Sequence, residues 1–128
     1  MDLVLILARE LASNLATATF LVDPKGTLVY YNEAAEELLG EKYDEVGDLT
    51  TEQWGTMWAP EDPDTGRAVP VDELPLAIAL GEERAAHRAM KIVGIDGVRR
   101  NIEVTAFPLF SQSEQSVGAV AIFWEIGA

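Results

Sequence analysis

The chain has no cysteine among its 128 residues, and His87 is its one histidine. The lack of thiols excludes disulfides, thiolate metal sites, cysteine nucleophiles and chromophores attached through a cysteine. It also suits a reducing compartment, so we expect a cytoplasmic protein. His87 has no second strong metal ligand near it in the sequence, so we expect no metal site.

Basic side chains are also scarce, with nine Lys and Arg against 22 Asp and Glu and a formal net charge of −13. The excess lies in residues 33–83, which hold fifteen acidic residues and two basic ones. Phosphate groups are bound by clustered Lys and Arg, so we expect no binding to nucleic acid or to an anionic membrane. We interpret the acidic segment as a solubilising surface, with the steering of a basic partner as the alternative.

Long apolar runs are missing as well. Residues 3–8 are too few to span a bilayer, and Asp2 stands where a secretory signal has basic residues. Apolar residues instead recur at helical spacing, which predicts a helix over residues 3–16 that is apolar most of the way round and requires burial on two sides. The stripe consists of Val4, Leu7, Ala8, Leu11 and Leu15, widened by Leu3, Leu5 and Ile6.

The strongest local signals lie in residues 19–40. Two β-prone runs, residues 20–22 and 27–31, flank Asp23-Pro24-Lys25-Gly26. That composition favours a tight turn, because proline presets φ and glycine accepts a left-handed φ. Asn32 stands where its side chain can cap a helix over residues 33–39, and Gly40 fits the left-handed residue that ends it.

The rest of the chain predicts a helical middle and then a meander of strands. Residues 49–58 hold one or two helical turns, and a further helix begins with Asp72 as its N-cap and ends at Gly81. The last strand is apolar on both of its alternating faces, so both faces of the sheet require cover. Three strands joined by hairpins are expected at residues 84–93, 98–110 and 116–126.

From Ala18 to Ile126 the order of these segments resembles that of PAS sensor domains. The resemblance implies an α+β PAS fold, a five-stranded antiparallel sheet with helices on one face and an additional N-terminal helix. It divides the chain into a helix for dimerisation or capping at residues 1–17 and a PAS domain at residues 18–128. The matching pieces lie at residues 20–35, 74–81, 94–97 and 117–120.

The resemblance also implies a function. PAS domains act as sensor or dimerisation modules that regulate an attached effector, such as a histidine kinase, cyclase or phosphatase. We therefore expect a module that is not itself an enzyme and that binds a small apolar ligand. Many members end in Asp-Ile-Thr before an output helix, whereas this chain has Glu125-Ile126-Gly127. We expect the chain to be part of a larger signalling protein.

Aromatic and aliphatic residues supply the candidate ligand site. A flavin held without a covalent bond is an alternative occupant, for which Tyr43 and Trp124 are further aromatic candidates. Haem sensors of the family place their histidine on the helical side of the pocket, whereas His87 falls on a predicted strand. We therefore expect neither flavin nor haem, and no catalytic residues. The expected pocket residues are Trp54, Trp58, Ile78, Val104 and Ile122.

A second hypothesis is a small α+β enzyme or carrier with a substrate pocket in the curved sheet. It requires a buried carboxylate or histidine with a strongly shifted pKa in that pocket. The aliphatic residues of the predicted strands favour the sensor instead.

We also expect a homodimer, because a helix that covers the sheet leaves its own outer apolar side exposed. Burial of each large aliphatic side chain is worth about 1.5–3 kcal/mol, so a few of them are enough to drive a symmetric dimer. The candidate interface residues are Leu3, Ile6, Leu7 and Leu11.

Overall fold

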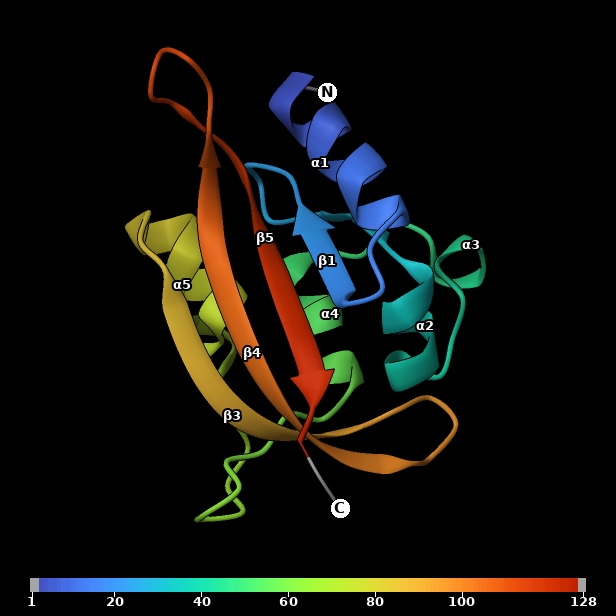
Figure 1. Cartoon of the computed structure of the whole chain (residues 1–128). Helices are drawn as coiled ribbons and strands as arrows, with labels where there is room; N and C mark the ends of the chain where they lie inside the picture. Colours follow the sequence, from blue (N-terminus) through green and yellow to red (C-terminus); the bar gives the residue numbers. More distant parts are fainter. Residues whose placement is uncertain (1–2, 127–128) are drawn as a thin grey trace.

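A computed structural model describes residues 3–126 (Figure 1). It has the predicted order of a first helix, two strands, a helical middle and a meander. The helices are α1 (Leu3–Ser13), α2 (Glu33–Leu39), α3 (Tyr43–Val46), α4 (Thr51–Met57), the 3₁₀ turn η1 (Val71–Glu73) and α5 (Pro75–Glu82). The strands are β1 (Ala18–Val22), β2 (Leu28–Tyr31), β3 (Ala86–Val93), β4 (Arg99–Phe110) and β5 (Ser116–Glu125).

The five strands form one antiparallel sheet in the order β2-β1-β5-β4-β3, which confirms the predicted fold. Strand β5 lies at the centre, because β1 pairs with it along one edge and β4 along the other. One face, here called the inner face, is covered by the helical middle, and α1 lies on the opposite, outer face (Figure 1). Side chains alternate between the two faces along each strand.

Asn32 joins three elements and confirms the predicted helix cap. Its Oδ1 accepts hydrogen bonds from the backbone N–H of Ala35, at 3.1 Å, and of Thr19, at 3.0 Å. Its Nδ2 donates to the carbonyls of Ala12 and Thr17, each at 2.9 Å. The side chain is buried, so one amide fixes the start of α2, the first strand and the end of α1. Gly40 ends α2 with a φ of 79°, as predicted.

The start and the end of α5 differ from the prediction. Asp72 does not cap it, because residues 71–73 form the separate turn η1 and α5 begins at Pro75. Proline disfavours the helical conformation in the residue before it, and Leu74 has a ψ of 140°. The helix also continues past Gly81 to Glu82 and ends at Glu83, which takes a φ of 54°.

Helix α1 is shorter than predicted, and a different stripe faces the sheet. The side chains of Ser13 and Asn14 both donate to the carbonyl of Glu10, a local bond that competes with continuation of the helix. The buried residues of α1 are Leu5 and Ala12, whereas Leu7 and Leu11 of the helical stripe, both of them candidate interface residues, are exposed. Because this helix is apolar nearly all round, its periodicity fixes no unique inward side.

Candidate functional site

An apolar cavity of about 90 Å³ lies between the inner face of the sheet and the helical middle. Fourteen side chains line it, and none of the fourteen carries a charge. The sheet contributes side chains from four of its strands, and the helical middle contributes α4, α5, the segment between these two helices and the last residue of α2. The cavity therefore has the composition of a site for a small apolar molecule.

Strand alternation explains which sheet residues reach the cavity. On β5, Ala121 and Phe123 point inward, and on β4, Ile102 and Val104 do so. On β1, Phe20 lies at the centre of an aromatic cluster. Its ring stacks at 5.8 Å on Tyr31 and meets the rings of Trp54 and Trp58 edge to face at 5.7 and 5.9 Å. These contacts fix the two tryptophans of the cavity wall.

The structure brings together three of the five residues predicted for the pocket. Trp54, Trp58 and Val104 line the cavity. Ile122 does not, because its neighbours Ala121 and Phe123 face inward and place it on the outer face. Ile78 is half-buried on α5, in a groove beside α4, and does not line the cavity either. Sequence reasoning missed Phe20, whose strand position gave the same apolar signal as its neighbours.

The two cavity tryptophans differ in their hydrogen bonds. Nε1 of Trp54 donates to the carbonyl of Gly26 at 2.8 Å. Nε1 of Trp58 is buried and has no hydrogen-bond partner among the described residues. One side chain of the cavity wall therefore carries a buried donor that has no partner among the described residues.

The tyrosines beside this core are held neutral by their surroundings. Burial raises the pKa of Tyr31, and its hydroxyl donates to the carbonyl of Glu41 at 2.8 Å. Burial and a hydrogen bond with Asp48 raise the pKa of Tyr43 to about 12. Neither residue lines the cavity, and neither ionises near neutral pH, so they offer no acid or base to a bound molecule.

A polar cluster lies on the other side of the sheet. Nε2 of His87 is 3.0 Å from Oε2 of Glu103, and its Nδ1 is 2.8 Å from the hydroxyl oxygen of Thr105. Cross-strand register brings the three together. The His87 side chain is 53% exposed. Because the cluster lies on the outer face, His87 cannot ligate a group held in the cavity.

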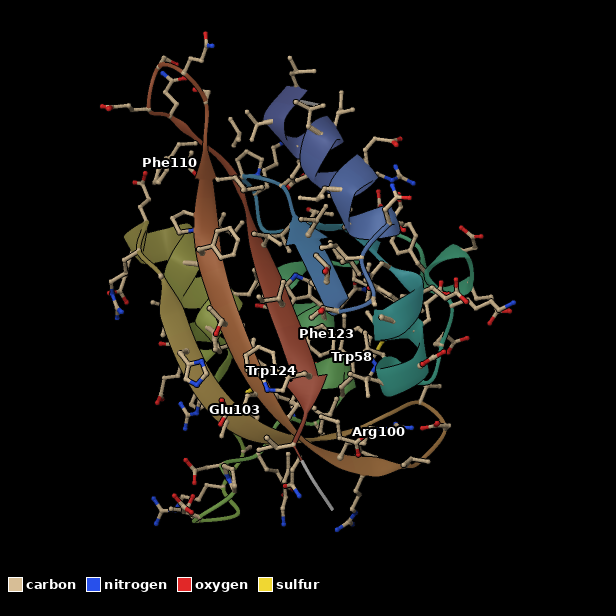
Figure 2. The ribbon with its side chains drawn as sticks, in the orientation of Figure 1. Trp58, Arg100, Glu103, Phe110, Phe123 and Trp124 are labelled. Atoms are coloured by element: carbon tan, nitrogen blue, oxygen red, sulfur yellow. The ribbon has the colours of Figure 1, made fainter. Side chains whose placement is uncertain are left out.

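The outer face also exposes large apolar side chains around α1. On the helix, Leu3, Leu7 and Leu11 are 66, 57 and 62% exposed, and Ile6 is 44% exposed. Strand β5 adds Trp124, which is 40% exposed (Figure 2). We call Leu3, Ile6, Leu7 and Leu11 the outer apolar surface; Trp124 lies on the same face of the sheet but away from α1 (Figure 2). Scattered apolar residues are normal on a protein, but four on one short helix are typical of an interaction site.

Within residues 3–126, no three or more His, Asp or Glu side chains are grouped so that they would hold a metal ion. No helix of that part is both long enough and apolar enough to cross a membrane.

The last strand ends with an acidic residue, as in many PAS domains. Glu125 is 3.9 Å from the guanidinium of Arg100. Gly127, where many PAS domains have threonine, lies outside the described residues.

Comparison with known proteins agrees with the fold. No curated protein sequence matches the chain. The PAS domain of the fruit-fly ELK potassium channel superposes with a TM-score of 0.75 at 12% identity, over 98% of each chain. The PAS domain of BvgS from Bordetella pertussis superposes with a TM-score of 0.65 at 14% identity, over 97% of this chain and 86% of the BvgS chain. The PAS domain of nitrogen regulation protein NR(II) from Vibrio parahaemolyticus superposes with a TM-score of 0.63 at 20% identity, over 94% of this chain and 98% of the NR(II) chain.

The sequence profile of the PAS domain matches residues 16–127, nearly the whole chain. That match agrees with the sheet order and with the helical middle on one face of the sheet (Figure 1). The chain belongs to the PAS domain family, whose members are sensory and signalling modules.

Proposed function

We propose that this domain is a cytoplasmic sensor that binds a small apolar molecule in the cavity and regulates an attached effector as a homodimer. The observation that carries the proposal is the cavity itself, in which every one of the fourteen lining side chains is uncharged. An apolar space favours an apolar occupant, because a charged or strongly polar one loses part of its hydration there without compensation.

The central strand links the proposed ligand to the proposed dimer. Phe123 of β5 contributes to the cavity wall, and the next residue, Trp124, is exposed on the opposite face of the sheet, the face on which α1 also lies (Figure 2). A ligand that moves β5 therefore changes both faces at once. Packed interfaces respond to such small shifts by exchange between two arrangements, and that exchange is how we propose the signal reaches the effector.

The homodimer rests on the exposed side of α1. Four large aliphatic side chains are between 44 and 66% exposed there, and each contributes up to about 1.5–3 kcal/mol when fully buried. A two-fold axis along α1 buries them against their own copies. We expect Leu7→Ser with Leu11→Ser to convert the dimer to a monomer in analytical ultracentrifugation. A matched variant, Ser13→Ala, changes the same helix outside that surface and keeps the dimer.

We propose that the domain itself catalyses no reaction. The enzyme hypothesis required a titratable group in the pocket, and none of the fourteen residues around the cavity is titratable. The one observation in favour of an enzyme is the cluster of His87, Glu103 and Thr105, which resembles a hydrolase triad in its residue types. It lies on an exposed sheet face, away from the cavity that would orient a substrate.

Native mass spectrometry of the purified domain tests the sensor function. We expect a small molecule that leaves on gentle activation, together with the mass of a dimer. A protein that carries no such molecule and binds none from a library of small apolar compounds would contradict the proposal. A hydrolase activity that disappears in His87→Ala would replace the proposal with the enzyme hypothesis.

A further inference from the structure

A second hollow lies among the helices and shares no lining residue with the apolar cavity. It is an open groove of about 1380 Å³ between α4, η1 and α5, and we call it the helical groove. Three half-buried side chains, those of Val71, Ala77 and Ile78, give it apolar surface. Sites for small molecules are enclosed and typically of about 300–1,000 Å³, so an open groove of this size fits a segment of another protein better.

Gly81 keeps part of the helical groove open, although nothing else in the described chain requires a glycine there. It lies within α5, its φ is not left-handed, and a Cβ built on it meets no described atom within 4 Å. On α4, by contrast, a Cβ on Gly55 would lie 2.9 Å from Cγ2 of Val71, so packing within the fold requires that glycine. Glycine weakens a helix relative to alanine. The presence of Gly81 is explained if another molecule approaches the backbone of α5 closely at this point.

The charged side chains that line the helical groove are all acidic. Glu52 of α4, Asp72 of η1 and Glu82 of α5 are exposed there. Within the described residues, neither Glu52 nor Asp72 has a basic group within 4.0 Å, and Glu82 pairs with Arg84 in an exposed contact at 2.9 Å. A carboxylate in the last turn of a helix opposes the helix dipole, so the stability of α5 does not explain Glu82. The groove therefore combines apolar surface with carboxylates that a basic partner would complement.

The uncharged polar side chains of the helical groove already have partners within the fold. Thr50 and Gln53 form the reciprocal capping box of α4. The hydroxyl of Thr51 donates to the carbonyl of Gly26 at 2.9 Å, and that of Thr56 donates to a carbonyl of the preceding turn at 2.8 Å. A partner therefore meets mainly apolar surface and carboxylates in this groove.

We propose that the helical groove binds a basic amphipathic helix of a partner protein. The apolar side of that helix contacts Ala77 and Ile78 and packs closely over Gly81, and Lys or Arg beside it pairs with Glu52 and Asp72. A helix fits because the groove runs between helices and offers no strand edge. The acidic excess of the helical middle attracts such a partner to this side of the molecule. This binding goes beyond the sensor function and does not depend on a ligand in the cavity.

Three synthetic peptides of about 14 residues test the charge and the periodicity of the partner. The first has leucine at helical spacing and lysine on its other side. The second has the same residues in an order without that spacing, and the third has glutamate in place of lysine. Isothermal titration calorimetry of the full chain measures each dissociation constant at about 0.15 M salt, where charges more than about 8 Å apart are largely screened. We expect one copy of the first peptide to bind per chain, the second to bind about tenfold more weakly, and the third not to bind.

Variants of the full chain test whether the first peptide lies in the groove. Gly81→Leu fills the groove without a change of charge and should weaken binding about tenfold, and it should fold because a Cβ there meets no neighbour and leucine favours a helix. Glu52→Gln with Asp72→Asn should weaken binding about fivefold. The matched control, Glu33→Gln with Glu37→Gln, removes the same charge from α2, outside the groove, and should change binding less than about twofold.

Two results would show that the peptide is attracted only by overall charge, and either one overturns the inference. They are equal binding of the first and second peptides, and equal losses in the groove pair and the control pair. Binding that is unchanged in folded Gly81→Leu overturns it as well. If circular dichroism shows that Gly81→Leu is unfolded, Gly81→Ala replaces it and should weaken binding about twofold, because it adds only a methyl group. If the wild-type chain binds none of the peptides, the inference fails and the sensor function is unaffected.

Discussion

The two faces of the sheet are built from the same strands but have different cover. The inner face lies under the helical middle, and its aromatic and aliphatic residues form one buried cluster around the cavity. The outer face has α1 alone, which buries Leu5 and Ala12 and leaves four other aliphatic residues exposed. Fold stability and the proposed ligand binding therefore depend on the inner face, whereas the proposed association and the exposed polar cluster belong to the outer one.

Neighbouring residues of β5 allow the sharpest test of this difference. Phe123 faces the cavity and is 5% exposed, whereas Trp124 faces outward and is 40% exposed (Figure 2). We expect Phe123→Ala to lower the free energy of unfolding by about 3–5 kcal/mol, because it enlarges a buried cavity. Trp124→Ala should cost about 1 kcal/mol or less in the monomer. Urea unfolding at several protein concentrations measures both and separates folding from association. Equal losses for the two variants would contradict the division between the faces.

Asn32 connects the two faces, and its loss should have the next largest effect. Asn32→Ala removes the acceptor for Thr19 and Ala35 and the donor for Ala12 and Thr17, all in a buried place. We expect a loss of about 2–4 kcal/mol in urea unfolding, more than that of an ordinary cap. Thr50 caps α4 through an exposed capping box and serves as the control.

Thr50→Ala should cost about 1 kcal/mol. If the two cap variants lose the same stability, Asn32 acts only as a helix cap and does not tie α1 to the rest. In that case a shortened protein without α1 should also lose little stability.

The smallest expected effect is a loss of folding stability in alkaline solution, which depends on two adjacent tyrosines of β2. Tyr31 belongs to the inner core, and Tyr30 faces Arg9 of α1 with the guanidinium 4.9 Å from the ring centre. Burial raises the pKa of both above the ordinary value of about 10, and more so for Tyr31. Since the unfolded chain then releases its protons first, stability is intact below about pH 10 and falls as pH rises through the folded-state pKa values.

Ultraviolet titration of phenolate absorbance, with unfolding followed by circular dichroism, measures this effect. Tyr30→Phe should remove the earlier phenolate transition and leave the later one, which accompanies unfolding. Ionisation of all three tyrosines near pH 10 in the folded protein would show that the core around Tyr31 is open to water.

The sequence predicted the elements well but not their orientation. The turn with Gly26, the cap at Asn32 and the left-handed Gly40 each depend on a local backbone requirement, so each was readable from a few residues. Ile122 and the inward side of α1 were not readable, because β5 and α1 are apolar on more than one side. In such elements, the side that faces the core is determined by the elements that pack against them.

Contacts between residues on different strands also could not be predicted from local sequence patterns. The meeting of His87 with Glu103 and Thr105 depends on the β3–β4 register, which the residue types alone do not give. The unpartnered nitrogen of Trp58 has no sequence signal at all, because it depends on which groups the fold places around one indole. Both features become visible only when side-chain positions are known.

The central claim is that the cavity on the inner face binds a small apolar molecule. ¹H–¹⁵N NMR titration with methylenecyclohexane tests it in the wild-type protein, Val104→Phe and Ile122→Phe. Val104 lines the cavity and Ile122 faces outward from the same sheet, so the two variants add a similar ring on opposite faces. We predict saturable shifts in the wild type and in Ile122→Phe, and none in Val104→Phe with its fold intact. Absence of saturable binding in the wild type, or equal binding by Val104→Phe, would contradict the account.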